Sequence, residues 1–343
     1  MIVLGIETSC DETAAGIVAD GKEVLANVIA SQADLHQAYG GIVPEVAARR
    51  HIELIVPTIE TALHEASLSL GDIDAVAVTS HMGLVGCVAV GVSAAKSIAF
   101  ARDLPLIGLQ HIEGHIYANH LEHPDLDPPF LCLTVSGGHT QLVLVEGRWR
   151  YRTMGETLDD SAGEAFDKVA RLLGLGFPGG PEIDRLSAEG DPRAFRFPRP
   201  LEKAKSFDFS FSGLKTAVKN RIAELERNSG SLPKADVAAS LQEAIADVLV
   251  GKTMRAARTL GVDTLAVTGG VAANSRLRQL FAERATEAGV RLVMPSKRLC
   301  TDNGAMIACA GYHRLRDGFR SSLELDAVAS ATLGEVEYEH ALA

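Results

Sequence analysis

The chain has 343 residues, of which 47% are apolar and 22% are charged, and its formal net charge is −11. This length exceeds what a single hydrophobic core usually serves, so we expect two domains. The composition is ordinary for a folded globular protein and excludes a disordered or fibrous chain. The acidic balance makes non-specific nucleic-acid binding by the surface as a whole unfavourable.

Cysteine usage and hydropathy both favour a cytoplasmic protein without a membrane span. No stretch approaches the roughly 20 unbroken apolar residues of a transmembrane helix. The N-terminal apolar run has no basic start and is too short for a signal peptide. The five cysteines are Cys10, Cys87, Cys132, Cys300 and Cys309. Their number is odd, they are scattered along the chain and no two form a CxxC pair, which argues against a disulfide framework or a cysteine zinc site.

A weak internal repeat organises the chain. Each copy has the pattern of a strand, a loop of small residues, a second strand, a turn and a third strand. The first copy begins with residues 2–9 and 14–19 and turns at 20–22; the second begins with 130–140 and 141–145 and turns at 146–148. Asp-Gly and Glu-Gly between apolar runs are hairpin signals.

Both copies continue into alternating helices and strands. The patterns predict helices over 45–64, 91–102, 162–173, 235–260 and 275–288, and strands over 74–79, 264–268 and 290–294. Such alternation favours parallel or mixed sheets covered on both faces. We therefore predict an α/β chain with two duplicated lobes around a central cleft, as in actin, sugar kinases and Hsp70. The expected lobes are 1–125, joined by C-terminal helices from 301–343, and 126–300, with the proline-rich residues 120–129 between them.

Three loops are candidates for nucleotide binding. Residues 7–13 and 136–140 occupy equivalent places in the two copies, one facing the cleft from each lobe. Their small residues would let backbone N–H groups approach phosphate. Residues 268–274 place glycines between a buried strand and a helix, which suits a nucleotide, although a plain strand-to-helix turn would look similar. Gly251-Lys252-Thr253 is no Walker loop, because Ala246 replaces the first glycine and a helix is predicted there.

The candidate metal ligands are two histidines separated by one helical turn. His111 and His115 would lie on one helical face, and Asp302 could supply an oxygen. The zinc-protease register is excluded because Glu113 is third in the motif rather than second. Two nitrogens and one oxygen with open positions suit Zn²⁺ or Fe²⁺. A coincidental histidine pair is the alternative.

Two further clusters carry charge. Glu164, Asp167 and Asp184 could accept hydrogen bonds from ribose hydroxyls, or could simply be favourable helix-start charges. Residues 191–221 contain eight Lys/Arg against three acidic residues. This basic stretch is either a solvated face or a phosphate-contacting patch.

Taken together, these motifs resemble one family, the tRNA N6-adenosine threonylcarbamoyltransferases of the bacterial TsaD (Gcp) type. The resemblance covers most of the chain and rests on residues 5–13, 39–45, 111–115, 135–140, 159–175, 177–184, 209–215, 268–274 and 301–304. It implies the two-lobed actin-like ATPase fold. It also implies transfer of a threonylcarbamoyl group from threonylcarbamoyl-adenylate to the N6 amine of the adenosine beside the anticodon, with release of AMP.

The resemblance also implies roles for individual residues. One divalent ion, Fe²⁺ or Zn²⁺, would be held by His111, His115 and Asp302. The adenylate, or an ATP-like nucleotide, would contact Thr134, Val135, Ser136, Gly137, Gly138, Asp167, Gly180, Asp184 and Asn274. Glu12 and His139 are candidates for the general base. Besides tRNA, the expected partners are a paralogous pseudo-enzyme of TsaB type and a small ATPase of TsaE type.

The chain departs from the family pattern at three places. His81-Met82-Gly83 replaces the usual Gly-Pro-Gly, Arg102 replaces an aromatic residue, and Gln110 stands where His or Asn is common. None is a proposed ligand. A small-molecule kinase of the same fold, a metalloprotease and a non-catalytic scaffold remain as alternatives.

Overall fold

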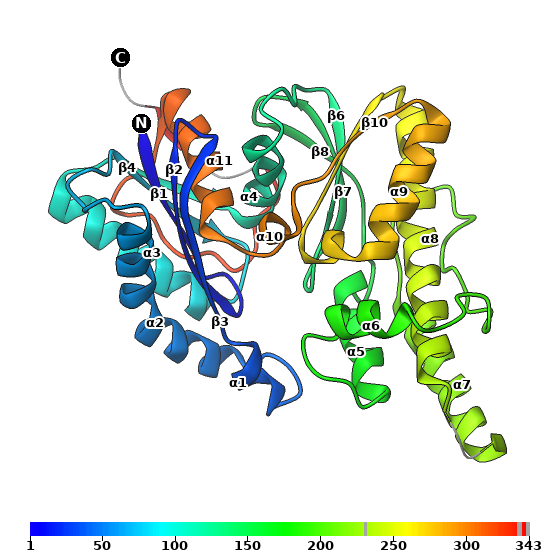
Figure 1. Ribbon diagram of the computed structural model, residues 1–343. Helices are drawn as coiled ribbons and strands as arrows, with labels where there is room; N and C mark the ends of the chain where they lie inside the picture. The colour runs from blue at the N-terminus through cyan, green and yellow to red at the C-terminus, as the bar shows by residue number, and fades with distance from the viewer. Residues whose placement is uncertain (230–231, 335–337, 341–343) are drawn as a thin grey trace. The chain divides into compact units, whose positions relative to one another are not determined.

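A computed structural model describes residues 1–229, 232–334 and 338–340 (Figure 1). The chain divides into two compact units. Unit 1 comprises Met1–Leu126 and Arg298–Ala343, and unit 2 comprises Asp127–Lys297.

Unit 1 is built on a mixed five-stranded sheet with the order β3-β2-β1-β4-β5. Strands β1 to β3 form antiparallel pairs, whereas β4 pairs parallel to both β1 and β5. The strands are β1 (Ile2–Glu7), β2 (Glu12–Ala19), β3 (Glu23–Ser31), β4 (Ala75–His81) and β5 (Leu106–Gln110). The helical segments are α1 (Ala33–Gln37), α2 (Pro44–Glu65), α3 (Val85–Arg102), α4 (His111–Ala118), η1 (Asn119–Leu121) and α11 (Gly304–Arg316).

The two faces of β1 and β2 bury different kinds of residue. Leu4 and Ile6 belong to the apolar core beneath α2 and α3. Gly5 and Gly16 lie beneath the start of α11, where a Cβ on Gly5 would come within 2.2 Å of the Gly304 carbonyl oxygen. These glycines therefore let α11 approach the sheet backbone, and this close approach fixes the position of Asp302, which precedes α11.

Unit 2 repeats the topology of unit 1. Its sheet has the order β10-β9-β6-β7-β8, with antiparallel β6–β7 and β7–β8 pairs and parallel β6–β9 and β9–β10 pairs. The strands are β6 (Phe130–Val135), β7 (Thr140–Gly147), β8 (Arg150–Glu156), β9 (Thr264–Thr268) and β10 (Arg291–Val293). The helical segments are α5 (Ala162–Leu172), α6 (Gly179–Ser187), α7 (Ser212–Ser229), α8 (Lys234–Leu260), η2 (Gly270–Ala273) and α9 (Ser275–Ala288), while α10 (Lys297–Cys300) crosses the unit boundary.

The predicted repeat and the alternation of elements are confirmed, with three differences. Helix α3 begins six residues earlier than residue 91. The second difference is a set of elements that were not predicted, namely α1, α7, α10 and β5. The third difference lies after Thr301, where several helices were expected. Among the described residues there, α11 is followed only by irregular chain and the short strands β11 (Phe319–Arg320) and β12 (Glu339–His340). Gly318, with a φ of 90°, follows the end of α11 and turns the chain away from the helix.

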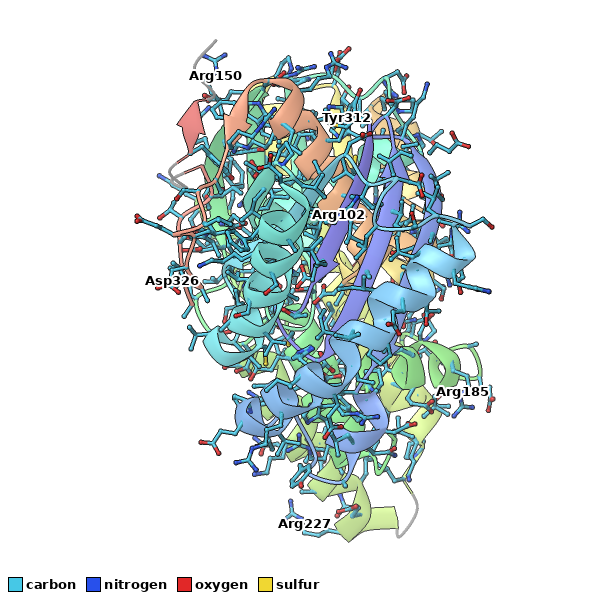
Figure 2. All side chains as sticks on the ribbon, turned by 90° about the vertical axis from the view of Figure 1, so that its left-hand side faces the viewer. Arg102, Arg150, Arg185, Arg227, Tyr312 and Asp326 are labelled. Carbon is cyan, nitrogen blue, oxygen red and sulfur yellow. The ribbon has the colours of Figure 1, made fainter. Side chains whose placement is uncertain are left out.

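Helix α3 is the one described helix long and apolar enough to cross a membrane by length and composition. This is weak evidence, because a core helix rich in small residues meets the same criterion. Its buried residues, among them Val88, Val92 and Ala95, belong to the core of unit 1. Figure 2 looks at this side and shows α2 and α3 in front of the unit 1 sheet.

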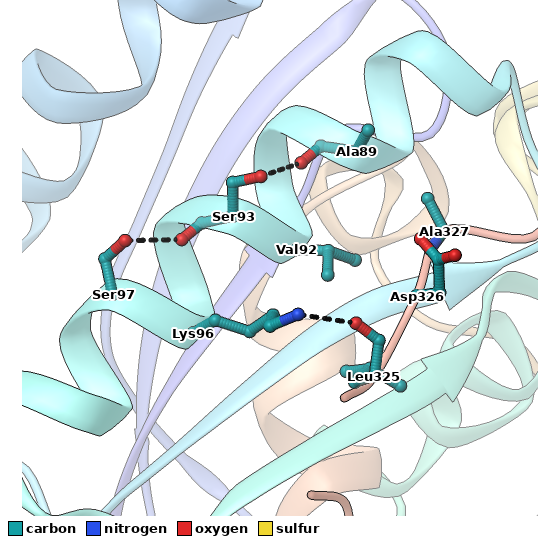
Figure 3. A pocket seen from close by; sticks show the side chains of 8 residues that line it. All are labelled: Ala89, Val92, Ser93, Lys96, Ser97, Leu325, Asp326 and Ala327. Atoms are coloured by element: carbon teal, nitrogen blue, oxygen red, sulfur yellow. Dashed lines mark hydrogen bonds between the residues drawn. The ribbon is translucent and has the colours of Figure 1, made fainter. Parts of the chain in front are cut away.

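A surface hollow of about 310 Å³ lies between α3 and residues 325–327 (Figure 3). Its polar side chains are already engaged within the protein. Ser93 and Ser97 donate to carbonyl oxygens of their own helix, and the Lys96 amine donates to the Leu325 carbonyl at 3.0 Å. Asp326 also lines the hollow; it is exposed, and its Oδ1 accepts a hydrogen bond from Ala327 N.

Candidate metal and nucleotide sites

Helix α4 carries the two candidate histidine ligands. It begins directly after β5, and the Gln110 side chain accepts hydrogen bonds from the backbone N–H groups of Ile112 and Glu113 at its first turn. His111 and His115 are both buried, with ring centroids 4.6 Å apart. Their spacing of four residues places both rings on the same side of the helix.

Asp302 completes a cluster with these histidines. Its Oδ1 lies 3.1 Å from His115 Nε2 and 3.6 Å from His111 Nε2. One ligand atom from each of the three residues lies within 4.8 Å of the others. The neighbouring Asn303 caps α11 by accepting a hydrogen bond from Met306 N, which holds Asp302 at the start of that helix.

The three residues fit a bound cation. Two ligands that each lie about 2.1 Å from a tetrahedral ion are about 3.4 Å apart, close to both histidine–aspartate distances. His115 Nε2 is also buried without a correctly directed hydrogen bond, although Asp302 is near. A buried ring nitrogen in this state is costly unless it meets a cation. Two nitrogens and a carboxylate oxygen suit Zn²⁺ or Fe²⁺ chemistry.

Glu7 orients one of the histidines and was not singled out as a site residue from the sequence. Its Oε2 lies 3.0 Å from His111 Nδ1 and accepts a hydrogen bond from Thr79 Oγ1 at 2.6 Å. Ser9 N donates to the other carboxylate oxygen. A carboxylate on the far ring nitrogen fixes the ring so that Nε2 is free for the ion. An acidic residue at the end of an otherwise apolar strand was the signal for this role.

The charges of this cluster are strongly coupled. Burial disfavours a protonated His111, but Asp302 and Glu7 outweigh it and raise the pKa of His111 to about 9. Burial likewise opposes ionisation of Glu7, yet His111 keeps the pKa of that carboxyl below its usual value. Without a cation, a proton on His111 therefore balances the two carboxylates.

Glu113 lies between the two histidines in sequence, but its side chain forms an ion pair with Arg314. Its Oε1 accepts a hydrogen bond from Arg314 Nη2 on α11 at 2.6 Å, and both side chains are almost fully buried. The Arg314 guanidinium also lies over the rings of Phe319 and Tyr338. Gly114 faces α11 too, because a Cβ there would lie 2.6 Å from Ile307 Cδ1. The middle of the motif thus fastens α4 to the helix that follows Asp302.

Two departures from the family pattern meet beside α4. The amide nitrogen of Gln110 donates to the sulfur of Met82 at 3.3 Å, while its oxygen caps the helix. Met82 has a φ of 69°, a left-handed conformation that is unusual for a side chain of this size. The altered loop therefore supports Gln110, the residue that precedes the helix carrying the two candidate histidine ligands. Arg102, the third departure, is the exposed last residue of α3.

Glu12, a candidate general base, begins β2 in unit 1. Its Oε1 accepts a hydrogen bond from Ser31 Oγ at 3.2 Å. Burial and the nearby carboxylates of Asp11 and Asp302 raise the pKa of Glu12 well above its usual value. Such a shift moves a carboxylate towards the range in which it can exchange protons near neutral pH.

In unit 2, the expected nucleotide residues come from segments that contact one another. The β6–β7 loop meets the first turn of α5, where a Cβ on Gly163 would lie 2.5 Å from Ser136 O. Asp167 on α5 accepts a hydrogen bond from Gly179 N at the start of α6. Asp184 on α6 accepts hydrogen bonds from Ser275 at the start of α9. The carboxyl end of β6 and the N-terminal ends of three helices are thereby linked.

Four glycines of these segments have no structural reason to be glycine. A Cβ at Gly137, Gly138, Gly180 or Gly270 would meet nothing within 4 Å, and none has a left-handed φ. Glycine costs backbone entropy, so its use here points to close approach by another molecule. The packed Gly163, Gly179 and Gly269 of the same segments differ, because a Cβ there would collide with backbone atoms.

The polar residues expected to contact the adenylate hold the protein framework in this structure. Asn274 caps α9 through Leu277 N and donates to Gln242 Oε1. Glu164 pairs with Lys168 at 2.6 Å. Thr134 and Val135 are buried within β6, and Ser136 Oγ accepts a hydrogen bond from His139 N in the same loop. Carboxylates and amides at these positions fix the loops, while the backbone of the open glycines remains accessible.

Comparison with known proteins shows the family of the chain. The family model for tRNA N6-adenosine threonylcarbamoyltransferase matches residues 23–309. A relative from Clostridium botulinum (strain Hall), named tRNA N6-adenosine threonylcarbamoyltransferase, is 51% identical over 333 residues, covering 97% of this chain and 98% of its own.

Solved structures identify the fold. Component A of (R)-2-hydroxyglutaryl-CoA dehydratase from Acidaminococcus fermentans superposes with a TM-score of 0.56 at 16% identity, covering 92% of this chain and 99% of its own. The ROK hexokinase from Thermus thermophilus gives 0.51 at 16% identity, with coverages of 93% and 100%. The predicted actin-like ATPase and sugar-kinase fold class is thereby confirmed. The family match and the identity over nearly the full chain show that this protein belongs to the tRNA N6-adenosine threonylcarbamoyltransferase family.

Proposed function

We propose that the protein transfers the threonylcarbamoyl group of threonylcarbamoyl-adenylate to the N6 amine of the adenosine next to the anticodon in tRNA, releasing AMP. The observation that carries this proposal is the cluster of the buried His111 and His115 with the partly buried Asp302 in a chain of this family. A kinase of the same fold has no need of such a cluster. We also propose that units 1 and 2 correspond to the two actin-like lobes.

The donor and acceptor determine what the protein must supply. The donor is a mixed anhydride, so AMP is already a good leaving group. The acceptor is an aromatic amine and a weak nucleophile. Positioning and stabilisation of developing charge therefore contribute most of the rate enhancement. The target adenosine belongs to a single-stranded loop, from which a base can be turned out at modest cost.

Unit 1 supplies the candidate electrophilic group. His111, His115 and Asp302 would hold one divalent ion, Fe²⁺ or Zn²⁺, with Glu7 fixing the His111 ring. When bound, such an ion supplies Lewis-acid polarisation of a carbonyl oxygen. Glu12 is the favoured proton acceptor for the amine, because its raised pKa suits proton transfer near neutral pH.

Unit 2 supplies the nucleotide contacts. The backbone N–H groups around Gly137 and Gly138 would receive the phosphate, and the open positions at Gly180 and Gly270 would let the nucleoside approach closely. Thr134, Val135 and Ser136 hold the strand end that carries this loop. Asp167 holds the start of α6, Asp184 and Asn274 hold the start of α9, and all three would offer their remaining acceptors to the ribose. His139 is the second candidate for the base.

We propose tRNA as substrate, a TsaB-type paralogue and a TsaE-type ATPase as partners, and the cytoplasm as the site of action. Exposed apolar side chains on α2 support a protein partner for unit 1. Ile52 is 65% exposed and Val56 is 57% exposed. They lie one helical turn apart on the same side of α2, and adjoining exposed apolar side chains, unlike scattered ones, mark protein interfaces.

The proposal is tested by reconstitution. The purified chain is incubated with its paralogue, the small ATPase, threonylcarbamoyl-adenylate and unmodified tRNA, and the digested tRNA is analysed by nucleoside mass spectrometry. We expect threonylcarbamoyladenosine from the wild type and from the exposed control His64→Ala, and none from His111→Ala or Asp302→Ala. Folded, metal-loaded wild type that forms no product would favour a kinase or a scaffold. Product that survives both ligand substitutions would keep the reaction and remove the proposed metal site.

A further inference from the structure

Residues 191–208 form a long irregular connection between α6 and α7 of unit 2, which we call the basic segment (Figure 1). It contains no helix and no strand. Connections of this length inside a compact unit are uncommon and usually either functional or disordered. The contacts of the basic segment with α8 show that it is ordered.

The basic segment lies along α8 and runs in the same direction as the helix. Its successive parts bond to successive turns of α8, and the contacts involve backbone and side-chain groups of the segment. Asp191 N donates to Asp236, Phe195 N donates to Ser240, and Arg199 forms two hydrogen bonds with Asp247. The anchored stretch of α8 from Asp236 to Arg255 is about 28 Å long at 1.5 Å per residue.

The far end of the basic segment is held most firmly. The Arg255 guanidinium donates to the carbonyl oxygens of Glu202, Ala204 and Ser206. The buried Lys252 amine donates to the Ser206 carbonyl as well. Two cations of α8 are thus used to fix the backbone of a segment that is itself basic. A segment that served only to join two helices would not require two buried or partly buried cations to hold its backbone.

The anchored backbone leaves four basic side chains exposed. The side chains of Arg193, Arg196, Lys203 and Lys205 form no hydrogen bond or ion pair with any part of the chain that the structure describes. Arg199, by contrast, is neutralised by Asp247.

The acidic residues of the same surface are largely engaged. Asp191 accepts a hydrogen bond from Arg193 N, and Asp208 accepts one from Glu156 N. Glu243 on α8 pairs with Arg276. Glu202 is exposed, and its carboxylate has no ion pair among the described residues. Hydrogen bonds from backbone N–H groups leave the Asp191 and Asp208 carboxylates charged, but the segment still contains five Lys/Arg against three acidic residues, so it is locally basic in a chain whose net charge is −11.

We propose that the basic segment is a binding surface for the sugar-phosphate backbone of RNA, contacted by Arg193, Arg196, Lys203 and Lys205. This inference rests on the proposed function, for which the RNA is the tRNA substrate. A 28 Å track is several times the spacing of successive phosphates along a nucleic-acid strand, which is about 3.4 Å along the axis of B-DNA, so it can contact several phosphates at once. An ordered backbone presents its charges without the entropy that a mobile loop would lose on binding. Contacts of this kind position the RNA and do not read its sequence.

The test neutralises the four side chains together as Arg193→Gln, Arg196→Gln, Lys203→Gln and Lys205→Gln. A matched control neutralises four exposed basic residues elsewhere, Lys22, Arg150, Arg284 and Lys297, each to Gln. Both variants carry the same net charge, so a difference between them in tRNA binding depends on where the substituted residues lie. Thermal unfolding of both should match the wild type, because exposed substitutions usually change stability by less than about 0.5 kcal/mol.

The complete reconstituted system then gives kcat and KM for tRNA, together with the salt dependence of tRNA affinity. For the basic-segment variant we expect KM to rise at least about tenfold with kcat nearly unchanged. The slope of log affinity against log salt should fall by about 2 to 4, since each lost phosphate contact removes roughly 0.7 to 0.9. An RNA without the target adenosine should lose affinity to the same extent.

A basic-segment variant that keeps the wild-type KM and salt slope would overturn the inference and leave the proposed function intact. Equal losses in the control variant would assign the effect to net charge and also overturn it. If the wild type forms no modified nucleoside, the proposed function fails. In that case a reduced salt slope for the basic-segment variant alone would still support RNA binding there.

Discussion

Units 1 and 2 share one strand order but use their equivalent loops in opposite ways. In unit 1 the β1–β2 loop and the segments near it present side chains, with Glu7, His111, His115 and Asp302 forming a buried charged cluster. In unit 2 the β6–β7 loop presents backbone, with Gly137 and Gly138 facing open space. On the proposed function, a duplicated framework carries a cation site in one unit and a phosphate-binding loop in the other. The first site depends on charged side chains and the second on accessible backbone N–H groups. Substitutions in the first should therefore reduce cation affinity, and substitutions in the second should reduce nucleotide binding.

The largest effect is expected from the ligands of unit 1. Asp302→Ala removes the atom that lies near both histidine rings, and His115→Ala removes a ring that has no other correctly directed partner. Outer contacts of metal ligands already contribute about 10- to 100-fold to affinity, so loss of a ligand should exceed that range. Chelator competition with Zn²⁺ measures the change. Wild-type affinity in either variant would mean that the cation binds elsewhere.

The next effect concerns the ion pair that fastens α4 to α11. Glu113→Gln removes the carboxylate charge that pairs with the buried Arg314 guanidinium, and breaking a buried ion pair from one side should cost about 3–5 kcal/mol. The matched control Glu53→Gln breaks the exposed Arg50–Glu53 pair and should cost less than about 1 kcal/mol. Denaturant unfolding of both variants gives the comparison. Equal small losses would show that the buried pair does not hold the two helices together.

A smaller effect should follow from the outer carboxylate. Glu7→Gln keeps the shape of the side chain but removes the charge that faces His111 Nδ1. We expect Zn²⁺ affinity to fall about 10- to 100-fold while the fold is retained. The measurement is again chelator competition, with circular dichroism as the check on folding. Unchanged affinity would reduce Glu7 to a structural residue of β1.

Metal affinity should also depend on pH. The ion must displace the proton that Asp302 and Glu7 keep on His111, whose pKa is about 9. Below that pH the proton competes, so apparent affinity should rise about tenfold per pH unit from pH 7 and level off near pH 9. In Glu7→Gln the levelling should come at lower pH, because one of the two carboxylates that raise the pKa has been removed. A flat profile between pH 7 and 8 would contradict the assigned charge state.

The same comparison shows what the sequence could reveal. The hairpin repeat, the histidine pair and the glycine loops were visible because each is a local pattern with its own period or composition. The contact between Glu113 and Arg314 spans 201 positions, and the one between Glu7 and His111 spans 104. No local pattern encodes such pairings, although a carboxylate ending an apolar strand and an arginine within an apolar helix both call for a partner. Helix α7 was missed although Leu214, Val218 and Ile222 recur every four residues and are buried, because the basic residues around them were interpreted only as a charged stretch.

The smallest expected effect tests the glycine loop of unit 2. Gly137→Ala and Gly180→Ala place a methyl group in open space, so stability should stay the same or rise by up to about 1 kcal/mol. Thermal stabilisation by AMP should nevertheless weaken, because the methyl occupies the path of the nucleotide.

Gly251→Ala is the matched control: it is equally open but lies on the surface of α8, and AMP stabilisation should be unchanged. Gly163→Ala should instead destabilise the protein, since its Cβ would collide with the Ser136 carbonyl. If Gly137→Ala and Gly251→Ala responded alike to AMP, the open glycines would have no role in binding, and the contrast between side-chain and backbone sites would fail on the unit 2 side.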